Sequence, residues 1–401
     1  MKKVCKNCLY DTDHPLGLTI NEEGICSGCL IHKEKYNLDW NERWDKLKKL
    51  VKEYRSIDKG NYDCVVPVTG ANDSYFTVYI VKEKLGLNPL LVTHNRYYNT
   101  PLGIRNLSNL RIRFDCDIII QNININSIKK LSKATLYRFG SFHWPVIAGQ
   151  TVLPVKTAIN HKIPLIIWGA HQGVEQVGMF SHLQEVEMTR RYRKDHDLMG
   201  IEADQLVNAF DIVKDEDIHQ LIYPSEKEIE KVGVRGIYLS NYIKWDPLQQ
   251  HLLMTKNYGY KTAKCQRTFD VYDHVDCWHF MGIHDHIKYL KHGYSKVLDH
   301  VCREIRHGRI SRNYGLKLVN FYSQQEPKHT ELLLEWLGIK KTSFQYVIEK
   351  HAKYGTKNKS NSTITESLDI SKTNKLGFNS SSSINYDYEE EQYVLFGKGY
   401  P

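Results

Sequence analysis

Short runs of apolar residues alternate with amphipathic stretches through the middle of the chain. Four apolar runs predict strands, namely DCVVPVT, PLLVTH, CDIIIQ and PLIIWG. The stretches between and around them predict helices over residues 73–85, 102–113, 128–138 and 152–160. Strands that alternate with helices are typical of a parallel sheet covered on both faces. The pattern therefore predicts an α/β fold built on a doubly wound parallel sheet.

The same pattern divides the chain into five parts. A short, turn-rich segment with four cysteines precedes an amphipathic helix, in which Trp40, Trp44, Leu47 and Val51 recur at helical spacing. Polar, irregular sequence follows the fourth apolar run, then mostly helical segments, then a stretch rich in Ser and Asn that is typical of disorder. The predicted parts are a small N-terminal domain at 1–33, a linking helix at 34–60, the α/β domain at 61–222, a helical region at 223–353 and a tail at 354–401.

Composition adds only a little to this picture. The 401 residues are 41% hydrophobic and 25% charged, close to ordinary globular usage. The net charge of +9 suits an anionic ligand, but an excess of Lys is equally typical of a solvated surface. No apolar run is long enough to span a bilayer, and MKKVCKNC lacks the apolar stretch of a secretory signal. We therefore expect a cytoplasmic protein without a membrane partner.

Four of the nine cysteines are spaced as a metal site. Cys5 and Cys8 form one Cys-x-x-Cys pair, and Cys26 and Cys29 form a second. Two such pairs are typical of a structural zinc ribbon, in which two tight turns present four thiolates. Four thiolates leave no open coordination position, so the expected Zn²⁺ is structural, and residues 1–33 are interpreted as a zinc ribbon.

A loop with candidate chemistry joins the first predicted strand to the following helix. The strand runs into Thr69, Gly70, Ala71, Asn72, Asp73 and Ser74, where a parallel sheet offers backbone N–H groups and a helix N-terminus to an anion. Each polar residue here is also compatible with a simple helix cap. The geometry alone favours phosphate binding only slightly.

The string TGANDS resembles the pyrophosphate loop of the ATP pyrophosphatases, the PP-loop superfamily, which usually reads S-G-G-x-D-S. The resemblance implies a fold of the adenine nucleotide alpha-hydrolase type, ATP bound with Mg²⁺ by all six loop residues, and catalytic roles for Asp73 and Ser74. The sequence departs from the pattern at Thr69, which keeps a hydroxyl. It departs again at Ala71, whose methyl group is unfavourable if the backbone needs positive φ. The G-x-x-x-x-G-K-[ST] pattern of other phosphate loops is absent.

Longer blocks of the chain are similar to the N-acetyl sugar amidotransferase family. They include GLNPLLVTHNRYYNTPLGIRNL, WPVIAGQTVLPVKTAINHKIPLIIWGAHQG, YPSEKEIEKVGVRGIYLSNYIKWDP and IKYLKHGYSKVLDHVCREIRHGRISR. This resemblance implies adenylylation of an acetamido oxygen by ATP, followed by attack of ammonia to give an acetamidino group. It also implies an acidic substrate, either a nonulosonic acid or a nucleotide-linked uronic acid of a surface polysaccharide.

Further site residues follow from the predicted sheet edge. His94 and Asn95 end the second strand, where base and ribose usually bind, although a loop-capping role is the alternative; Gly169 ends the fourth. The polar segment 171–200 lies where a lid and sugar-binding loop are expected. The candidate substrate residues near this edge are Arg105, Gln172, Glu175, Gln176, Glu187, Arg190 and Arg191. Ordinary solvated charge is the competing interpretation for each.

A cationic set suited to a carboxylate or phosphate follows nearer the C-terminus. It consists of Lys288, Lys291, Arg306, Arg309 and Arg312. A glutaminase with an N-terminal nucleophile needs Cys at its first position, whereas Lys2 follows Met1 here, and no segment is long enough for the other glutaminase type. We therefore expect ammonia from a separate glutaminase subunit.

Two other classes of function remain open. A tRNA-modifying enzyme would share the pyrophosphate loop, but Cys64 and Cys116 form no obvious reactive pair, and no basic tract with interleaved aromatic residues favours nucleic acid. A non-catalytic binding protein with a degenerate loop is the other alternative, motivated by Ala71.

Overall fold

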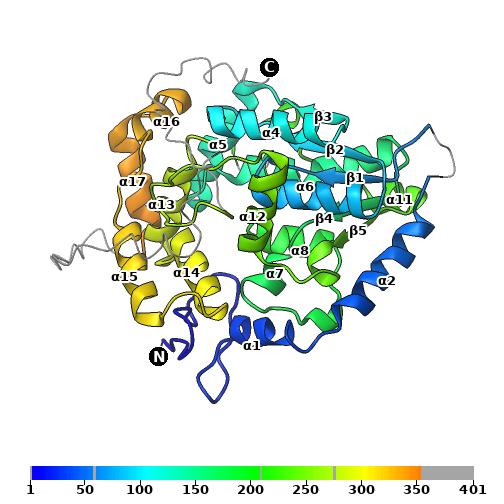
Figure 1. Ribbon diagram of the computed structural model, residues 1–401. Helices are drawn as coiled ribbons and strands as arrows, with labels where there is room; N and C mark the ends of the chain where they lie inside the picture. Colours follow the sequence, from blue (N-terminus) through cyan, green and yellow to red (C-terminus); the bar gives the residue numbers. More distant parts are fainter. Residues whose placement is uncertain (1, 57–59, 208–209, 274–276, 354–401) are drawn as a thin grey trace.

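The computed structural model describes residues 2–56, 60–207, 210–273 and 277–353 (Figure 1). The tail predicted at 354–401 lies outside the described residues. Five parallel strands form one sheet in the order β3-β2-β1-β4-β5. They are β1 (Cys64–Pro67), β2 (Pro89–His94), β3 (Ile118–Gln121), β4 (Leu165–Trp168) and β5 (Arg235–Tyr238). The predicted α/β fold with a doubly wound parallel sheet is confirmed.

The strand β5 was not predicted, and the segment after Tyr223 was interpreted as helical. This strand has only four residues and begins shortly after the helix α11 (Glu226–Val232), so its apolar run is too short to give a strand signal. It pairs with β4 from Leu165 to Trp168 and forms the edge of the sheet. The sheet therefore continues past the predicted domain boundary at residue 222.

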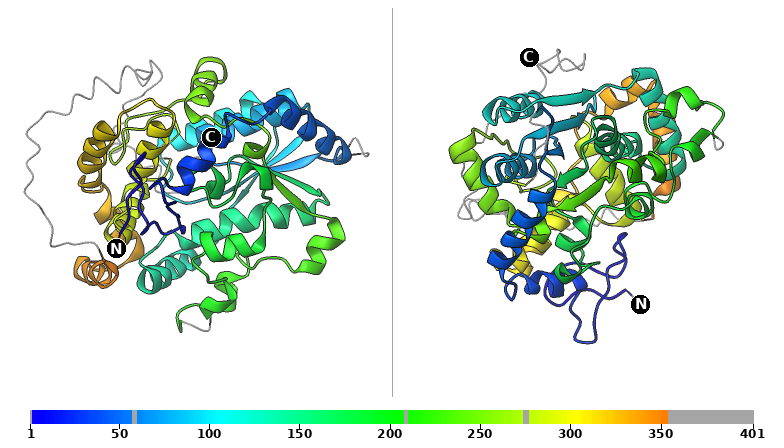
Figure 2. Two further views of the ribbon diagram at one scale, coloured as in Figure 1. Left: turned by 90° about the horizontal axis from the view of Figure 1, so that it is seen from below. Right: turned by 90° about the vertical axis from the view of Figure 1, so that its right-hand side faces the viewer.

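Helices cover both faces of the sheet (Figure 2), and alternate strand residues belong to opposite cores. Val66 and Ile167 belong to a core shared with the helices α2 (Trp40–Glu53), α3 (Asn72–Tyr79), α4 (Pro101–Arg113) and α12 (Pro247–Tyr258). Val65 and Ile166 belong to the opposite core, which contains α6 (Trp144–Asn160) and part of α11. Both cores exclude water from the sheet, which explains why the inner strands read as continuous apolar runs.

The predicted helices are present with shifted ends. The helix expected at 73–85 is α3 followed by the π-helix η1 (Ile80–Lys84), and those expected at 128–138 and 152–160 begin earlier, as α5 (Ile125–Phe139) and α6. Short turns of helix follow β4 through the polar segment. They are α7 (Gln172–Glu175), η2 (His182–Gln184), α8 (Arg190–Tyr192), η3 (Arg193–Asp197), α9 (Asp204–Val207) and α10 (Asp215–Ile218). The 3-10 turn η4 (Leu239–Asn241) follows β5.

The C-terminal helices form two further groups. The helices α13 (Met281–His292), α16 (Thr330–Leu337) and α17 (Lys341–His351) share a core with α5 and the start of α6. The helices α14 (Lys296–Arg306) and α15 (Arg312–Ser323) pack instead against the N-terminal segment and α1 (Ser27–Glu34), as Figures 1 and 2 show. Segments far apart in the sequence therefore share one core. Among the described residues, no helix has both the length and the apolar character needed to cross a membrane.

Candidate functional site

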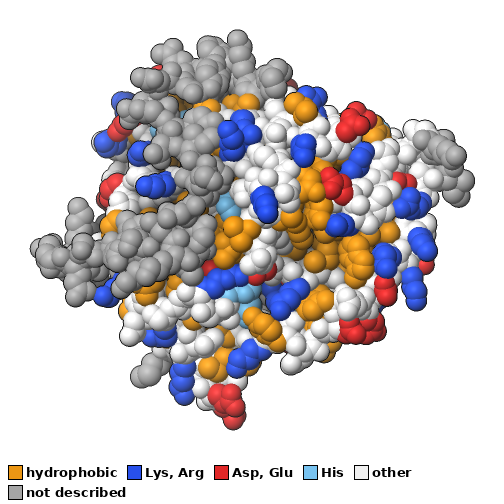
Figure 3. Space-filling model, in the orientation of Figure 1, with side chains coloured by type: hydrophobic (Ala, Val, Ile, Leu, Met, Phe, Trp, Pro, Cys, Tyr) orange, Lys and Arg blue, Asp and Glu red, His pale blue; other side chains and the backbone are white. Residues whose placement is uncertain are grey.

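A cavity of about 740 Å³ opens at the carboxyl edge of the sheet. Its wall includes Thr69 after β1, Arg96 after β2 and Ala170 after β4. The connections from β1 and from β4 leave in opposite directions along the sheet, so the gap between these strands is the switch point, where open α/β sheets bind ligands. Near the centre of the face seen in Figure 1, Lys, Arg and His side chains gather between α12 and α14 (Figure 3).

The loop after β1 has the shape of an anion-binding turn. Gly70 has φ +81°, and a Cβ atom there would lie 2.9 Å from the backbone nitrogen of Leu107, so only glycine fits. The backbone N–H of Thr69 donates to Ser74 Oγ at 2.9 Å, which closes the loop over the start of α3. Ala71 has φ −79°, a conformation open to any L-residue. Its methyl group therefore introduces no backbone strain.

Asp73 is the carboxyl group that the loop presents to the cavity. Its Oδ1 accepts a hydrogen bond from the N–H of Ser74 at 2.8 Å. Loss of solvation raises the pKa of Asp73, and the ammonium group of Lys296 counteracts this effect. The loop is also fixed from outside, because Asn72 Nδ2 donates to the carbonyl of Pro247 at 3.1 Å.

Of the seven substrate residues predicted near the sheet edge, three line the cavity, all from the turn that follows β4. They are Gln172, Glu175 and Gln176. Glu175 is ion-paired with the buried Lys35, and its other oxygen lies 3.5 Å from His182 Nε2. Gln176 donates through Nε2 to the hydroxyl of Tyr294 at 2.5 Å. The side chain of Gln172 is therefore the most available of the three to contact a ligand.

Other predicted residues lie away from the cavity. Glu187 is bound by Arg235 at 2.6 Å, Arg190 pairs with Glu202 at 3.2 Å, and the side chain of Arg191 is 93% exposed. These contacts place Glu187, Arg190 and Arg191 on the outer surface of the polar segment. The lid segment therefore contributes its beginning and its end to the cavity, and its middle does not reach it.

The residues predicted at the ends of β2 and β4 have structural contacts. His94 is packed against Gly149 of α6 and lies 3.0 Å from Gln121, and Asn95 accepts hydrogen bonds from Tyr97 and Asn99. Asn95 thus has the loop-capping role that was the alternative. Gly169 and Arg105 do not line the cavity either. A Cβ atom on Gly169 would lie 3.0 Å from Thr77 Oγ1, and Arg105 donates to the carbonyl of Gly259 at 2.7 Å.

The predicted cationic set divides in two. Lys288, Lys291 and Arg306 line the cavity, whereas Arg309 and Arg312 do not. Arg309 pairs with Asp246 at 2.5 Å, and Arg312 donates to the carbonyl of Cys8 at 3.1 Å. These two side chains hold segments of the protein together and are not available to a substrate.

The cavity wall also contains charged residues that the sequence analysis missed, among them Arg96, Lys296 and Asp197. Arg96 donates to Cys277 Sγ at 3.0 Å beside the loop, Lys296 begins α14, and Asp197 ends η3. Burial raises the pKa of Asp197 to about 6, and Arg193 counteracts this rise only in part. A carboxyl group with such a pKa, facing a cavity, is suited to proton transfer near neutral pH.

A second group of acidic residues lies deeper in the wall. Ligand atoms of Asp270, Asp273 and His300 lie within 4.8 Å of one another. Arg303 ion-pairs with both Asp270 and Asp273 and donates to Glu304 at 2.8 Å. Burial raises the pKa of Asp273 to about 6 despite this guanidinium. Arg303 therefore offsets only part of the negative charge of this group.

The four predicted metal ligands come together at the N-terminus. The sulfur atoms of Cys5, Cys8, Cys26 and Cys29 are buried and lie within 4.8 Å of one another. Cys8 and Cys26 are 3.6 Å apart and Cys5 and Cys29 are 3.9 Å apart, which agrees with roughly 3.8 Å between ligands of a tetrahedral Zn²⁺ with Zn–S bonds of about 2.3 Å. The N–H of Cys26 also donates to Cys5 Sγ at 3.2 Å. The donor set fits zinc.

Fold and cavity together define an α/β protein whose β1–α3 loop opens onto a cavity at the switch point of its sheet. Residues 266–370 match the family model described as "LPS biosynthesis protein WbpG-like, C-terminal domain". The match lies outside the loop and covers the segment that supplies α13 to α17. It is therefore independent of the PP-loop resemblance.

Two further similarities concern parts of the chain. A stretch of 121 residues is 32% identical to the uncharacterized protein MJ1599 of Methanocaldococcus jannaschii, covering 29% of this chain and 42% of that protein. The chain thus spans less than half of this relative's length. An NH3-dependent NAD synthetase from Campylobacter jejuni aligns with 49% of this chain and 92% of its own at 13% identity, with a TM-score of 0.27. That structural similarity is too weak to bear on function.

Proposed function

We propose that this protein is an ATP-dependent amidotransferase that converts an acetamido group of an acidic sugar to an acetamidino group. One observation carries the proposal: the loop from Thr69 to Ser74 opens onto the cavity at the switch point, with Asp73 facing basic side chains across it. The similarity of residues 266–370 to a lipopolysaccharide biosynthesis family supports a sugar as the acceptor. The family resemblance of the longer sequence blocks supports the reaction.

The loop is suited to the β- and γ-phosphates of ATP. Positive φ at Gly70 turns the backbone toward the start of α3, where N–H groups and the helix dipole favour an anion. Asp73 would hold Mg²⁺, which when bound neutralises charge on the departing pyrophosphate. Arg96 and Lys296 lie in the same wall and can bind phosphate oxygens directly.

The proposed reaction balances in two steps. The acetamido oxygen attacks the α-phosphorus of ATP, pyrophosphate leaves, and the acetamido carbon becomes an imidate that carries AMP. Ammonia then adds to that carbon, the bond from carbon to the AMP oxygen breaks, and one proton is lost as the amidinium forms. Water would compete with ammonia at the imidate, so we assign the exclusion of water to the two ends of the polar segment 171–200, which line the cavity.

We assign proton acceptance to Asp197. Its carboxyl group lines the cavity, and its pKa of about 6 leaves it mostly ionised at neutral pH while still basic enough to take a proton. His284 also lines the cavity, but burial lowers its pKa to about 3, which makes it a poor base. Asp197 is therefore a better proton acceptor than His284 for the step in which ammonia adds.

The proposal includes a structural Zn²⁺ and a separate glutaminase. Four thiolates would hold the metal, and the surrounding segment contributes Tyr10, His32 and Lys35 to the cavity wall. The zinc ribbon would therefore shape the site without taking part in chemistry. We propose a separate glutaminase as the source of the ammonia that the second step consumes.

Pyrophosphate release tests the proposal. Zinc-loaded protein with ATP, Mg²⁺ and ammonium chloride should release pyrophosphate and AMP only when an N-acetylated acidic sugar is added. Asp73→Asn should reduce release at least about 100-fold, whereas Glu187→Gln, outside the cavity, should retain it. Release of ADP, or pyrophosphate release that ignores the sugar, would contradict the proposal.

A further inference from the structure

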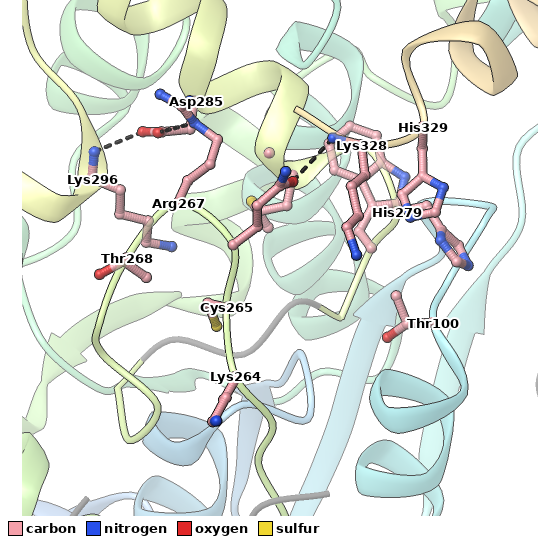
Figure 4. Close-up of a pocket in the computed structure, with 14 residues that line it drawn as sticks. Thr100, Lys264, Cys265, Arg267, Thr268, His279, Asp285, Lys296, Lys328 and His329 are labelled. Atoms are coloured by element: carbon pink, nitrogen blue, oxygen red, sulfur yellow. Dashed lines mark hydrogen bonds and ion pairs between the residues drawn. The ribbon is translucent and has the colours of Figure 1, made fainter. Parts of the chain in front are cut away.

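A second pocket, of about 270 Å³, adjoins the nucleotide cavity. The two share Met281, Asp285 and Lys296 as a common wall. Figure 4 shows Lys296 on one side of this pocket and Lys328, His279 and His329 on the other. Its volume is smaller than the 300–1,000 Å³ typical of a whole ligand, so it suits one portion of a larger molecule.

The pocket carries an excess of positive charge. Lys264, Lys296 and Lys328 line it, and their ammonium groups have no ion-pair partner among residues 2–56, 60–207, 210–273 and 277–353. Its acidic residue, Asp285, is already neutralised, because Arg267 Nε lies 2.9 Å from Oδ2 and the N–H of Lys296 donates to Oδ1 at 2.6 Å. Three uncompensated ammonium groups around one pocket favour an anion.

The wall also offers donors from buried positions. Trp278 is 1% exposed, and its indole N–H has no hydrogen-bond partner in the described part of the chain. A buried donor without a partner is costly unless a ligand or water accepts from it. Most of the wall, from Gln266 to His329, belongs to the segment that matches the lipopolysaccharide biosynthesis family. The pocket is thus built by the part of the protein that resembles sugar-processing proteins.

We propose that this pocket binds the anionic group of the acceptor sugar, a carboxylate or a diphosphate, while the acetamido group reaches past Lys296 into the nucleotide cavity. The inference rests on the proposed function and replaces the predicted anionic anchor. Arg309 and Arg312 are occupied by protein partners, and Arg306 donates to the carbonyl of Gln176 at 2.6 Å. Lys288 Nζ lies 3.9 Å from Asp285 Oδ1, and Lys291 donates to the carbonyl of Phe139. In the described part of the chain, the three lysines of the second pocket are therefore the cations near the cavity without such partners.

Lys296 would connect the two sites. Its ammonium group favours the ionised form of Asp73 in the loop, so it is close enough to affect the nucleotide site electrostatically. Lys296 also lines the second pocket. Binding of the acceptor anion would therefore place charge beside the same ammonium group that faces the ATP phosphates, and Lys296→Gln should weaken both ligands.

Calorimetry on the full, zinc-loaded chain tests the subsite without turnover. Saturating α,β-methylene ATP occupies the nucleotide site, and the probes are N-acetylneuraminic acid for a carboxylate and uridine diphosphate N-acetylglucosamine for a diphosphate. Neutral N-acetylglucosamine is the control ligand. The test variant is Lys264→Gln with Lys328→Gln, two exposed side chains whose replacement should leave the fold intact. The matched control is Lys227→Gln with Lys340→Gln, exposed lysines outside both pockets.

One anionic probe should bind the wild type, and the test variant should weaken that binding about tenfold or more, while the control variant and the affinity for the ATP analogue stay unchanged. Equal affinity in the test variant and the wild type would overturn the subsite, as would failure of both anionic probes to bind the wild type. If wild-type protein still releases pyrophosphate with an acidic sugar in either case, the proposed function stands without this subsite. If the test variant binds the anionic probe more weakly but the wild type releases no pyrophosphate, the subsite is supported and the proposed function is contradicted.

Discussion

The guanidinium of Arg306 donates a hydrogen bond to the backbone carbonyl of Gln176 at 2.6 Å. The same group lies 5.0 Å from the ring of Tyr10, and its other nitrogen lies 3.9 Å from Cys26 Sγ. One side chain on α14 thus joins the cysteine cluster to the turn that follows β4. The N-terminal segment is held to the candidate site by this contact and by the ion pair of Lys35 with Glu175.

Arg306→Ala should therefore act mainly on stability. Losing a partly buried, charge-assisted hydrogen bond and the contact with Tyr10 should lower the free energy of unfolding by about 2 kcal/mol. Arg191→Ala is the control, because its side chain is 93% exposed and should change stability by less than about 0.5 kcal/mol. Urea denaturation measures both. Equal stability of Arg306→Ala and the wild type would refute the role as a connector.

One Zn²⁺ per chain should accompany the purified protein, and Cys26→Ser should lose it. Because Tyr10, His32 and Lys35 line the cavity, metal loss should reduce sugar turnover as well as unfold the N-terminal segment. Elemental analysis gives the stoichiometry, and Cys116→Ser, outside the cluster, is the matched control. A folded, reduced sample without metal would exclude the zinc assignment.

Two neighbouring substitutions in the loop should have opposite consequences. Gly70→Ala forces a side chain into positive φ and against Leu107, so it should cost about 1 to 3 kcal/mol of stability and weaken ATP binding strongly. Ala71→Gly removes a methyl group where φ is already −79°, and ATP affinity should change by less than about threefold. Isothermal titration with an ATP analogue compares them. A large gain in affinity for Ala71→Gly would mean that the natural loop is impaired.

Activity should rise with pH through about 6 if Asp197 accepts the proton. The carboxyl group must be ionised to act, and its raised pKa means that the active fraction falls as pH drops below about 6. Asp197→Asn should remove this limb of the profile and lower kcat at least about 100-fold.

The same change should raise the free energy of unfolding at pH 7.5 by on the order of 1 kcal/mol. A raised carboxyl pKa stabilises the fold at low pH, and that contribution is lost as pH rises through 6.

Asp195→Asn is the control for this pH profile. Asp195 lies in the same π-helix but pairs with Arg191 outside the cavity. Its replacement should leave the profile of the wild type unchanged. An unaltered low-pH limb in Asp197→Asn would assign the titration to another group, with Asp273 the first to examine because its pKa is also about 6.

The sequence predicted those parts of the site that depend on local pattern. Apolar runs located β1 and β4, and the strings after them located Asp73 and Gln172 at one edge of the sheet, because parallel strands end together. Cysteine spacing likewise predicted the cluster that the structure brings together. In each case a short stretch of chain determines the geometry.

Contacts between distant segments could not be predicted in this way. The sequence analysis treated Arg309 and Arg312 as cations available to a substrate. In the structure, Arg309 pairs with Asp246 and Arg312 donates to the carbonyl of Cys8, and both partners belong to distant parts of the chain. Conversely, Lys296 had no local signal, and its role depends on α14 beginning beside the loop. Asp197 lay within the segment expected as a lid, but only burial distinguishes it from the other acidic residues there.

Transfer of the acetamido oxygen to AMP is the central claim, and isotope labelling measures it directly. The acceptor is prepared with ¹⁸O in the acetamido carbonyl and incubated with ATP, Mg²⁺ and ammonia, and the AMP is analysed by mass spectrometry. The account predicts one ¹⁸O atom in the phosphoryl group of AMP for each acetamidino group formed, because the bond from carbon to that oxygen breaks when ammonia displaces AMP. Unlabelled AMP, or ADP as the nucleotide product, would contradict it.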